Sequence, residues 1–359
     1  MSETEAVHFK YEITVLGIWL KENTRLQFSY GIPHEVSVTL RPPTAAEQKA
    51  GHQCDHAFCT TQTQRKLSLH LHEMFEILVD NRIPAGSEQT DKWSKYLDED
   101  GRIRDNYALP FELLPPPLRD FARQVLTELS NIAAKAIGIL RWRCGMQGPH
   151  TPIRGRGGGL DWSFDGTNWR SLGSIYLSNV HGYVPATMPD NICDQIVKLL
   201  EQKAEEPLGH ELLREAWEQK NANPRSALLI GIAAAETSFK EYVGDSAPDA
   251  RWLIEHLPSP PLIEMLRDYL PTLPVKGRIC GQVLPPPPEI LETLKNGVSL
   301  RNKIAHLGVK KLSQETVEEV LLAVRDTLWI LDCYRGFPWA LDHVRPQIRE
   351  HLETLASKS

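Results

Sequence analysis

The chain has 359 residues and a formal net charge of −6, with 41% hydrophobic and 24% charged residues. These values are typical of a globular protein with room for two domains, and they exclude nucleic-acid binding through a strongly basic overall field. No apolar run approaches the ~20 residues that cross a bilayer, and the start, MSETEAVHFKYE, lacks the features of a secretion signal. We therefore expect a cytoplasmic protein without membrane contact, in which six scattered cysteines are reduced thiols.

The N-terminal part has the pattern of a sheet. Residues 11–20 and 35–40 are strand-like, and the second run alternates apolar with polar side chains. Residues 42–62 are polar and are expected to be irregular. A helix is predicted over 67–79, and the stretch 81–117 resembles a long loop that ends in three prolines.

A long helix is predicted next. Apolar residues recur from Leu118 to Ile132 at the spacing of one buried helical stripe. The run Ile137 to Arg143 indicates a strand, and Asp165-Gly166 between aromatic-rich runs predicts a hairpin. Together these elements predict an α+β first domain with an antiparallel sheet, residues 1–188.

Beyond Pro189 the pattern changes to helices, which predicts an all-α second domain over residues 189–359. The stretch 258–288 is rich in proline and should hold only short helical pieces, such as 262–269. The longer predicted helices are one capped by Asp190 or Asn191 and running to Lys203, one over 210–220, one over 225–243 opened by Asn223-Pro224, and one capped by Ser313 with its apolar stripe over 317–331.

The stretch LRNKIAH, residues 300–306, is the strongest candidate for chemistry. It combines Arg301, Asn302 and His306 in a locally basic run, which we place at a helix junction after an Asn296-Gly297 turn and ahead of the last long helix. The spacing of Arg and His alone is uninformative, because RKLSLH (residues 65–70) and RWLIEH (residues 251–256) repeat it. The amide after the arginine and the excess of positive charge distinguish the third copy.

Residues 300–306, together with PRSALLIGIAAAETSFKEYV upstream, resemble the HEPN domain (higher eukaryotes and prokaryotes nucleotide-binding) over roughly residues 205–336. The resemblance implies an all-α fold, a homodimer in which two such motifs face each other, and metal-independent cleavage of RNA without a cofactor. Arg301, Asn302 and His306 would be the catalytic residues. Such proteins often act as toxins or antiviral effectors, so a trigger or a neutralising partner is expected. The first domain, outside the resemblance, is a candidate for sensing or substrate recognition.

The implied mechanism uses the imidazole as a general acid or base and the guanidinium as a stabiliser of negative charge. Attack of the ribose 2′-hydroxyl would leave a 2′,3′-cyclic phosphate and a 5′-hydroxyl. In an ideal helix residues five apart differ by about 140°, so Arg301 and His306 would not share a face. Asn302 and His306, four apart, would share one.

Two other interpretations of the motif are structural or non-catalytic. Arg301 is equally suited to a salt bridge with a helix carboxylate such as Glu236 or Glu318, with His306 capping or packing a helix end. The domain would then be a HEPN-like dimer that binds RNA, a nucleotide or a protein.

Basic residues outside the motif are candidates for contact with RNA. Between Leu129 and Leu160 five basic residues and Trp142 occur without an acidic residue, a combination that suits phosphate and base together. The alternative is a solvated strand edge followed by a flexible loop. The candidate RNA-binding residues are Lys303, Lys310, Lys311, Arg141, Arg143, Arg154 and Arg156.

A zinc site is the third and weakest hypothesis. Histidines and cysteines gather near residue 55, but their spacing matches no standard arrangement of two separated ligand pairs. A polar loop with incidental zinc-compatible side chains explains the pattern better, and we assign no metal ligand. The residues concerned are His52, Cys54, His56 and Cys59, with His70 and His72 further on.

Overall fold

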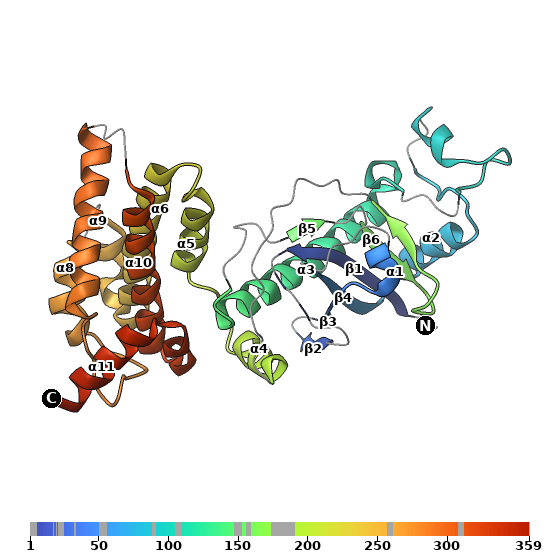
Figure 1. Cartoon of the computed structure of the whole chain (residues 1–359). Helices are drawn as coiled ribbons and strands as arrows, with labels where there is room; N and C mark the ends of the chain where they lie inside the picture. Colours follow the sequence, from blue (N-terminus) through green and yellow to red (C-terminus); the bar gives the residue numbers. More distant parts are fainter. Residues whose placement is uncertain are drawn as a thin grey trace. The chain divides into compact units, whose positions relative to one another are not determined.

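The computed structural model of the chain describes residues 6–16, 18, 20, 25–31, 34–49, 56–87, 91–104, 109–146, 153–155, 159–173, 191–256, 261–307 and 312–358. The chain forms two compact units, coloured in sequence order in Figure 1. Unit 1 comprises Met1–Cys144 and Thr151–Glu205, and unit 2 comprises Gly145–His150 and Glu206–Ser359. The expected α+β class is confirmed, because the described sheet strands lie in unit 1 and unit 2 is built of helices.

Unit 1 is built on an antiparallel sheet with the strand order β2-β3-β4-β1-β6-β7, in which β5 also pairs with β1. The predicted strands near residues 11–20 and 35–40 are present as β1 and β3, and the predicted hairpin joins β6 to β7. The strands are β1 (Ala6–Leu16), β2 (Leu26–Gly31), β3 (Glu35–Arg41), β4 (His56–Lys66), β5 (Ile153–Gly155), β6 (Leu160–Ser163) and β7 (Arg170–Leu172).

One prediction for this unit was wrong because a central strand is polar. The stretch 42–62, expected to be irregular, contains the short helix α1 (Ala45–Lys49) and the first half of β4. β4 lies between β3 and β1 and carries threonines, whose β-branched side chains favour strands. The Thr61 hydroxyl donates to the carbonyl oxygen of Leu129 at 3.3 Å, which ties β4 to a helix.

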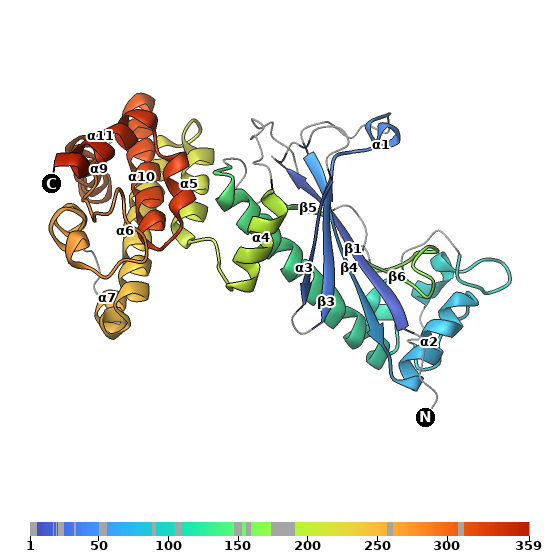
Figure 2. The same cartoon turned by 90° about the horizontal axis from the view of Figure 1, so that it is seen from below.

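That helix is α3 (Pro116–Arg143), which runs along one face of the sheet (Figures 1 and 2). The predicted strand over Ile137–Arg143 was wrong, since these residues form the last two turns of α3. The helix continues because Ala133, Ala136 and Leu140 extend the buried stripe that begins at Leu118. Helix α2 (Leu69–Val79), predicted over 67–79, packs Phe75 against the ring of Trp162 with centroids 4.7 Å apart.

The units divide later in the chain than the expected boundary at residues 188/189. Helix α4 (Ile192–Glu201), which we assigned to the second domain, belongs to unit 1. Its buried residues include Ile192, Ile196 and Leu200, and the guanidinium of Arg143 in α3 donates to the side chain of Gln195 at 2.6 Å. The apolar face of α4 therefore completes unit 1 rather than starting unit 2.

In unit 2, helices α6, α9 and α10 pack together, with α5 against α6. The predicted cap at Ser313 is confirmed, because its hydroxyl accepts from the backbone N–H of Thr316 at 3.1 Å. Asn223, predicted to open a helix, accepts from the backbone N–H of Ser226 at 3.2 Å. Asn191 stands at the start of α4, but its side chain makes no capping hydrogen bond. The longer helices are α5 (Leu208–Gln219), α6 (Pro224–Ser246), α9 (Pro288–Leu307), α10 (Gln314–Tyr334) and α11 (Pro346–Lys358).

Shorter helical pieces complete the described structure. Those in the proline-rich stretch of unit 2 agree with the expected lack of long helices there. No helix within the described ranges is both long and apolar enough to cross a lipid bilayer. The short pieces are α7 (Arg251–His256), α8 (Leu262–Glu264) and segments of one or two turns over Asp91–Tyr96, Phe111–Leu113, Pro248–Ala250, Met265–Tyr269, Leu270–Thr272 and Pro338–His343.

Candidate functional site

The RNKIAH stretch lies at the carboxyl end of α9, not at the start of a helix. Residues 296–297, expected to form a turn, are in the middle of α9. A Cβ on Gly297 would come within 2.8 Å of a methyl carbon of Val320 and 2.9 Å of one of Ile232. The glycine therefore serves the close packing of α9 against α10 and α6, and the helix continues through it.

Arg301 is held by an ion pair that joins two helices. Its guanidinium donates to the carboxylate of Glu236 in the middle of α6, and the two side chains are 23% and 17% exposed. One of the two carboxylates proposed as structural partners is therefore the observed one. At this partial burial the pair fixes the arginine more firmly than a surface ion pair would.

The neighbouring residues of the motif remain available to a ligand. Asn302, Lys303 and His306 are exposed, and within the described residues the side chains of Asn302 and His306 make no hydrogen bond or ion pair. Because both lie in α9, their four-residue spacing sets them on one side of the helix. His306 also lies in the last turn of α9. Lys310 and Lys311 are outside the described residues.

The two arginines at the end of α3 are poorly placed to bind RNA. Arg141 is 3% exposed and Arg143 is 8% exposed, and Arg143 contacts α4. Side chains buried to this degree cannot contact RNA unless unit 1 rearranges. They do not form the solvated edge that we considered as the alternative. The side chain of Arg154, in β5, and all of Arg156 lie outside the described residues.

The histidines and cysteines considered for zinc are dispersed where the structure describes them. Cys59 is completely buried in β4, and this burial raises the pKa of its thiol to about 12. His70 and His72 lie on α2. In the described ranges no group of three or more candidate ligands gathers around a point. His52, Cys54 and the side chain of His56 lie outside those ranges.

The other two stretches with the same Arg-to-His spacing, RKLSLH and RWLIEH, have contacts that explain one residue of each as structural. Arg65 in β4 is buried and donates to Glu128 of α3 at 2.7 Å. His256 at the end of α7 stacks on the ring of Trp252, with centroids 4.4 Å apart, and both are exposed. Neither arrangement sets an anchored arginine beside an exposed amide and imidazole.

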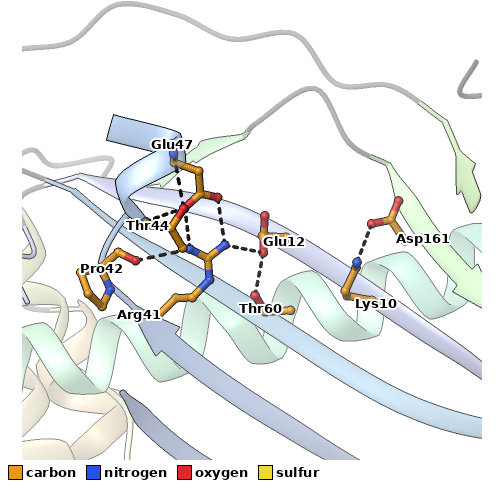
Figure 3. A network of polar contacts seen from close by, with 8 residues as sticks. All are labelled: Lys10, Glu12, Arg41, Pro42, Thr44, Glu47, Thr60 and Asp161. Carbon is orange, nitrogen blue, oxygen red and sulfur yellow. Dashed lines mark hydrogen bonds and ion pairs between the residues drawn. The ribbon is translucent and has the colours of Figure 1, made fainter. Parts of the chain in front are cut away.

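Sequence reasoning missed a polar network at one end of the sheet in unit 1, drawn in Figure 3. Arg41 makes two bonds to Glu47, of 2.8 and 3.1 Å, and a longer one of 3.5 Å to Glu12. The hydrogen bonds from Arg41 hold the pKa of the Glu47 carboxyl at about 2. The backbone N–H of Thr44 donates to Glu47 at 2.8 Å, and that of Glu47 donates to the Thr44 hydroxyl at 3.3 Å. The spacing Thr-x-x-Glu of this reciprocal helix cap was the overlooked signal.

A second missed network is buried in unit 2. The imidazole Nε2 of His210 lies 2.7 Å from Asp332, and Arg335 donates to the other oxygen of that carboxylate at 2.9 Å. Asp332 is fully buried, and the ring of His210 lies 4.2 Å from that of Trp329. A substrate has no access to groups so enclosed, so we interpret this network as structural. His210 and Asp332 are 122 residues apart, and no local pattern marks them.

Comparison with models of protein families, with characterised proteins and with solved structures found no match to this chain.

Proposed function

We propose that unit 2 is a HEPN-like domain of a cytoplasmic endoribonuclease that cleaves RNA without a metal ion. The observation that carries the proposal is an arginine anchored on Glu236 in the same last turns of α9 as exposed Asn302 and His306. Guanidinium and imidazole groups suit a phosphodiester, because one stays charged and the other exchanges protons near neutral pH.

In the proposed reaction His306 exchanges protons with the substrate. One imidazole takes the proton of the ribose 2′-hydroxyl, whose oxygen then bonds to phosphorus. The bond from phosphorus to the 5′-oxygen breaks, and that oxygen receives a proton from an imidazolium. Arg301 stabilises the charge on the phosphoryl oxygens, and Asn302 holds the phosphate by hydrogen bonds.

A second copy of the chain supplies the second imidazole. One chain offers one RNKIAH stretch, and its single histidine cannot easily act as base on one side of the phosphorus and as acid on the other. We therefore propose a homodimer through unit 2 in which two α9 ends face each other, with the exposed Lys303 adding positive charge for the RNA backbone. Such an enzyme fits a toxin or antiviral effector that is silent until a trigger reaches it.

The runner-up is a dimeric module that binds RNA, a nucleotide or a protein without catalysis. The ion pair between Arg301 and Glu236 favours this candidate, because a guanidinium already neutralised by a carboxylate is less available to a phosphate.

Incubation of the full chain with a mixed RNA pool, with and without EDTA, separates these proposals. Metal-independent cleavage predicts fragments ending in 2′,3′-cyclic phosphate in both conditions, and a loss of at least about 100-fold in rate for His306→Ala. The matched control is His256→Ala, which removes an exposed histidine with the same spacing to an arginine. RNA binding without cleavage supports the runner-up, whereas cleavage abolished by EDTA, or unaffected by His306→Ala, contradicts the proposed mechanism.

A further inference from the structure

The sheet of unit 1 has one apolar and one polar face. Along β3, Val36, Val38 and Leu40 are completely buried, whereas the alternate residues Ser37 and Thr39 are only partly so. The same alternation in β1, β2 and β4 sets polar side chains on the face opposite α3. One face of an antiparallel sheet needs no core contacts, so its residues are free to serve another purpose.

The polar face contains a hollow of about 350 Å³, within the size range of small-molecule sites. Every side chain that lines it is polar or charged. Three are cations and one is a carboxylate, so the lining carries an excess of two positive charges. The lining residues are Lys10, Glu12, Arg25, Gln27, Ser37, Thr39, Arg41, Thr60 and Gln62.

Most of the charged groups are held in place by residues behind or beside them. Glu12 accepts from Arg41 at 3.5 Å and from the hydroxyl of Thr60 at 3.0 Å. Lys10 pairs with Asp161 at 3.4 Å, and its ammonium lies 4.2 Å from the centre of the Trp169 ring. Figure 3 shows the contacts of Glu12 with Arg41 and Thr60 and the pair of Lys10 with Asp161. Side chains fixed in this way lose little freedom when a ligand arrives, which favours binding.

Arg25 differs from the other two cations. It is exposed just before β2, and the structure gives it no ion pair or hydrogen bond within the described residues. Glu47 and Asp161 balance Arg41 and Lys10, and neither of these carboxylates lines the hollow. Among the described residues Arg25 is therefore the lining cation without a carboxylate partner, and its planar guanidinium suits the phosphate of a ligand.

The neutral residues define the rest of the ligand. Gln27, Gln62 and three hydroxyl side chains offer both donors and acceptors, which suit hydroxyl groups. None of the described residues that line the hollow is aromatic or aliphatic, so they offer no stacking platform of the kind on which single-stranded nucleic acid binds. We propose that the hollow binds a small phosphorylated sugar, with its phosphate at Arg25 and its hydroxyls on the polar strand residues. The site lies in unit 1 and does not depend on the proposed nuclease activity.

Calorimetric titration of the full chain tests this site. Ribose 5-phosphate and a nucleoside 5′-monophosphate both carry a phosphate on a sugar with free hydroxyl groups. Inorganic phosphate supplies the phosphate alone, and ribose supplies the sugar alone. We expect saturable binding of at least one phosphate ester, and binding at least about tenfold weaker for inorganic phosphate and for ribose. If the nucleoside 5′-monophosphate binds more tightly than ribose 5-phosphate, the hollow also recognises the nucleobase.

Arg25→Gln should weaken binding of that ester at least about tenfold, and Lys10→Gln should weaken it to a smaller degree. The matched control is Arg102→Gln, which removes an exposed arginine of unit 1 that does not line the hollow. Unchanged thermal unfolding of Arg25→Gln shows that the loss is local. The proposal is overturned if neither ester binds, if inorganic phosphate binds as tightly as the esters, if Arg25→Gln and Arg102→Gln behave alike, or if an RNA oligonucleotide alone binds.

Discussion

The two candidate sites each hold an arginine against a glutamate, but they are assembled over different distances along the chain. In unit 1, Arg41 and Glu47 are six residues apart, at the end of β3 and the start of α1. In unit 2, Arg301 and Glu236 are 65 residues apart on two packed helices. The first pair follows from a local helix cap, whereas the second requires that α6 and α9 have already packed.

An ion pair between arginine and glutamate therefore does not by itself identify a functional site, whereas the residues around the pair do. Arg41 is paired with Glu47 of the helix cap and Glu12 of β1, and it lines a polar hollow in which Arg25 is the cation without a carboxylate partner among the described residues. Arg301 is followed in the last turns of α9 by exposed Asn302 and His306, which a ligand can reach. The α9 end suits a reaction, and the sheet face suits recognition.

The largest expected effect is on cleavage by unit 2. Arg301→Ala should lower the rate of RNA cleavage by about 100-fold or more, because a preorganised donor to the developing charge is lost. Arg301→Lys should recover only part of the rate, since an ammonium lacks the two-pronged geometry of a guanidinium. Initial rates on a labelled RNA measure both variants. Arg251→Ala, at the same spacing from a histidine, is the control, and an equal loss there would contradict a specific role.

Close packing at Gly297 gives the next largest effect. Gly297→Ala should destabilise the protein by about 1–3 kcal/mol, because its Cβ would overlap a methyl group of Val320 on α10. Unfolding in urea measures this loss. Gly31→Ala is the matched change, since nothing lies within 4 Å of a Cβ there. If Gly297→Ala were neutral or stabilising, the stretch would be a mobile end of the helix, and the anchoring of Arg301 would lose its support.

These packing details explain which parts of the fold the sequence predicted. Elements with clear apolar periodicity or side-chain caps were found, such as the stripe from Leu118 to Ile132 and the caps at Asn223 and Ser313. Polar β4 was missed because its strand tendency comes from threonines and from pairing on both edges. The end of α3 was assigned to a strand because a short apolar run is ambiguous without its neighbours.

The candidate site was predicted in composition but not in placement. The residues Arg301, Asn302 and His306 were recognised by type, and Glu236 was named as one partner for the arginine. Their position in α9 was missed, because Asn296-Gly297 has the pattern of a turn unless one knows that Gly297 faces Val320. The polar hollow was not predicted because its lining comes from four strands. The register of these strands follows from their pairing, which no short sequence motif indicates.

A smaller effect is expected from the acid in the sheet network. The pKa of Glu47 is lowered to about 2 by hydrogen bonds from Arg41, so its stabilisation is complete above about pH 4.5 and is lost as the pH falls toward 2. At neutral pH, Glu47→Gln should lower the free energy of unfolding by on the order of 1.5 kcal/mol. That deficit relative to the unsubstituted protein should shrink between pH 4.5 and 2.5. A deficit independent of pH would show that the carboxylate charge is not the stabilising feature.

The smallest expected effects come from two helix caps, one in each unit. Thr44→Ala and Ser313→Ala each remove a hydroxyl that accepts from a backbone N–H, at a cost of about 1 kcal/mol. The Thr44 hydroxyl also donates to Glu47 at 2.9 Å, whereas the Ser313 hydroxyl donates to Glu315 outside any arginine pair. In a double-mutant cycle of unfolding free energies, Thr44→Ala should therefore combine non-additively with Glu47→Gln. Ser313→Ala should combine additively with the same Glu47→Gln. Additivity in both cycles would mean that the Thr44 cap and the Arg41 network form independently. It would contradict the claim that the pair of Arg41 and Glu47 follows from the local helix cap.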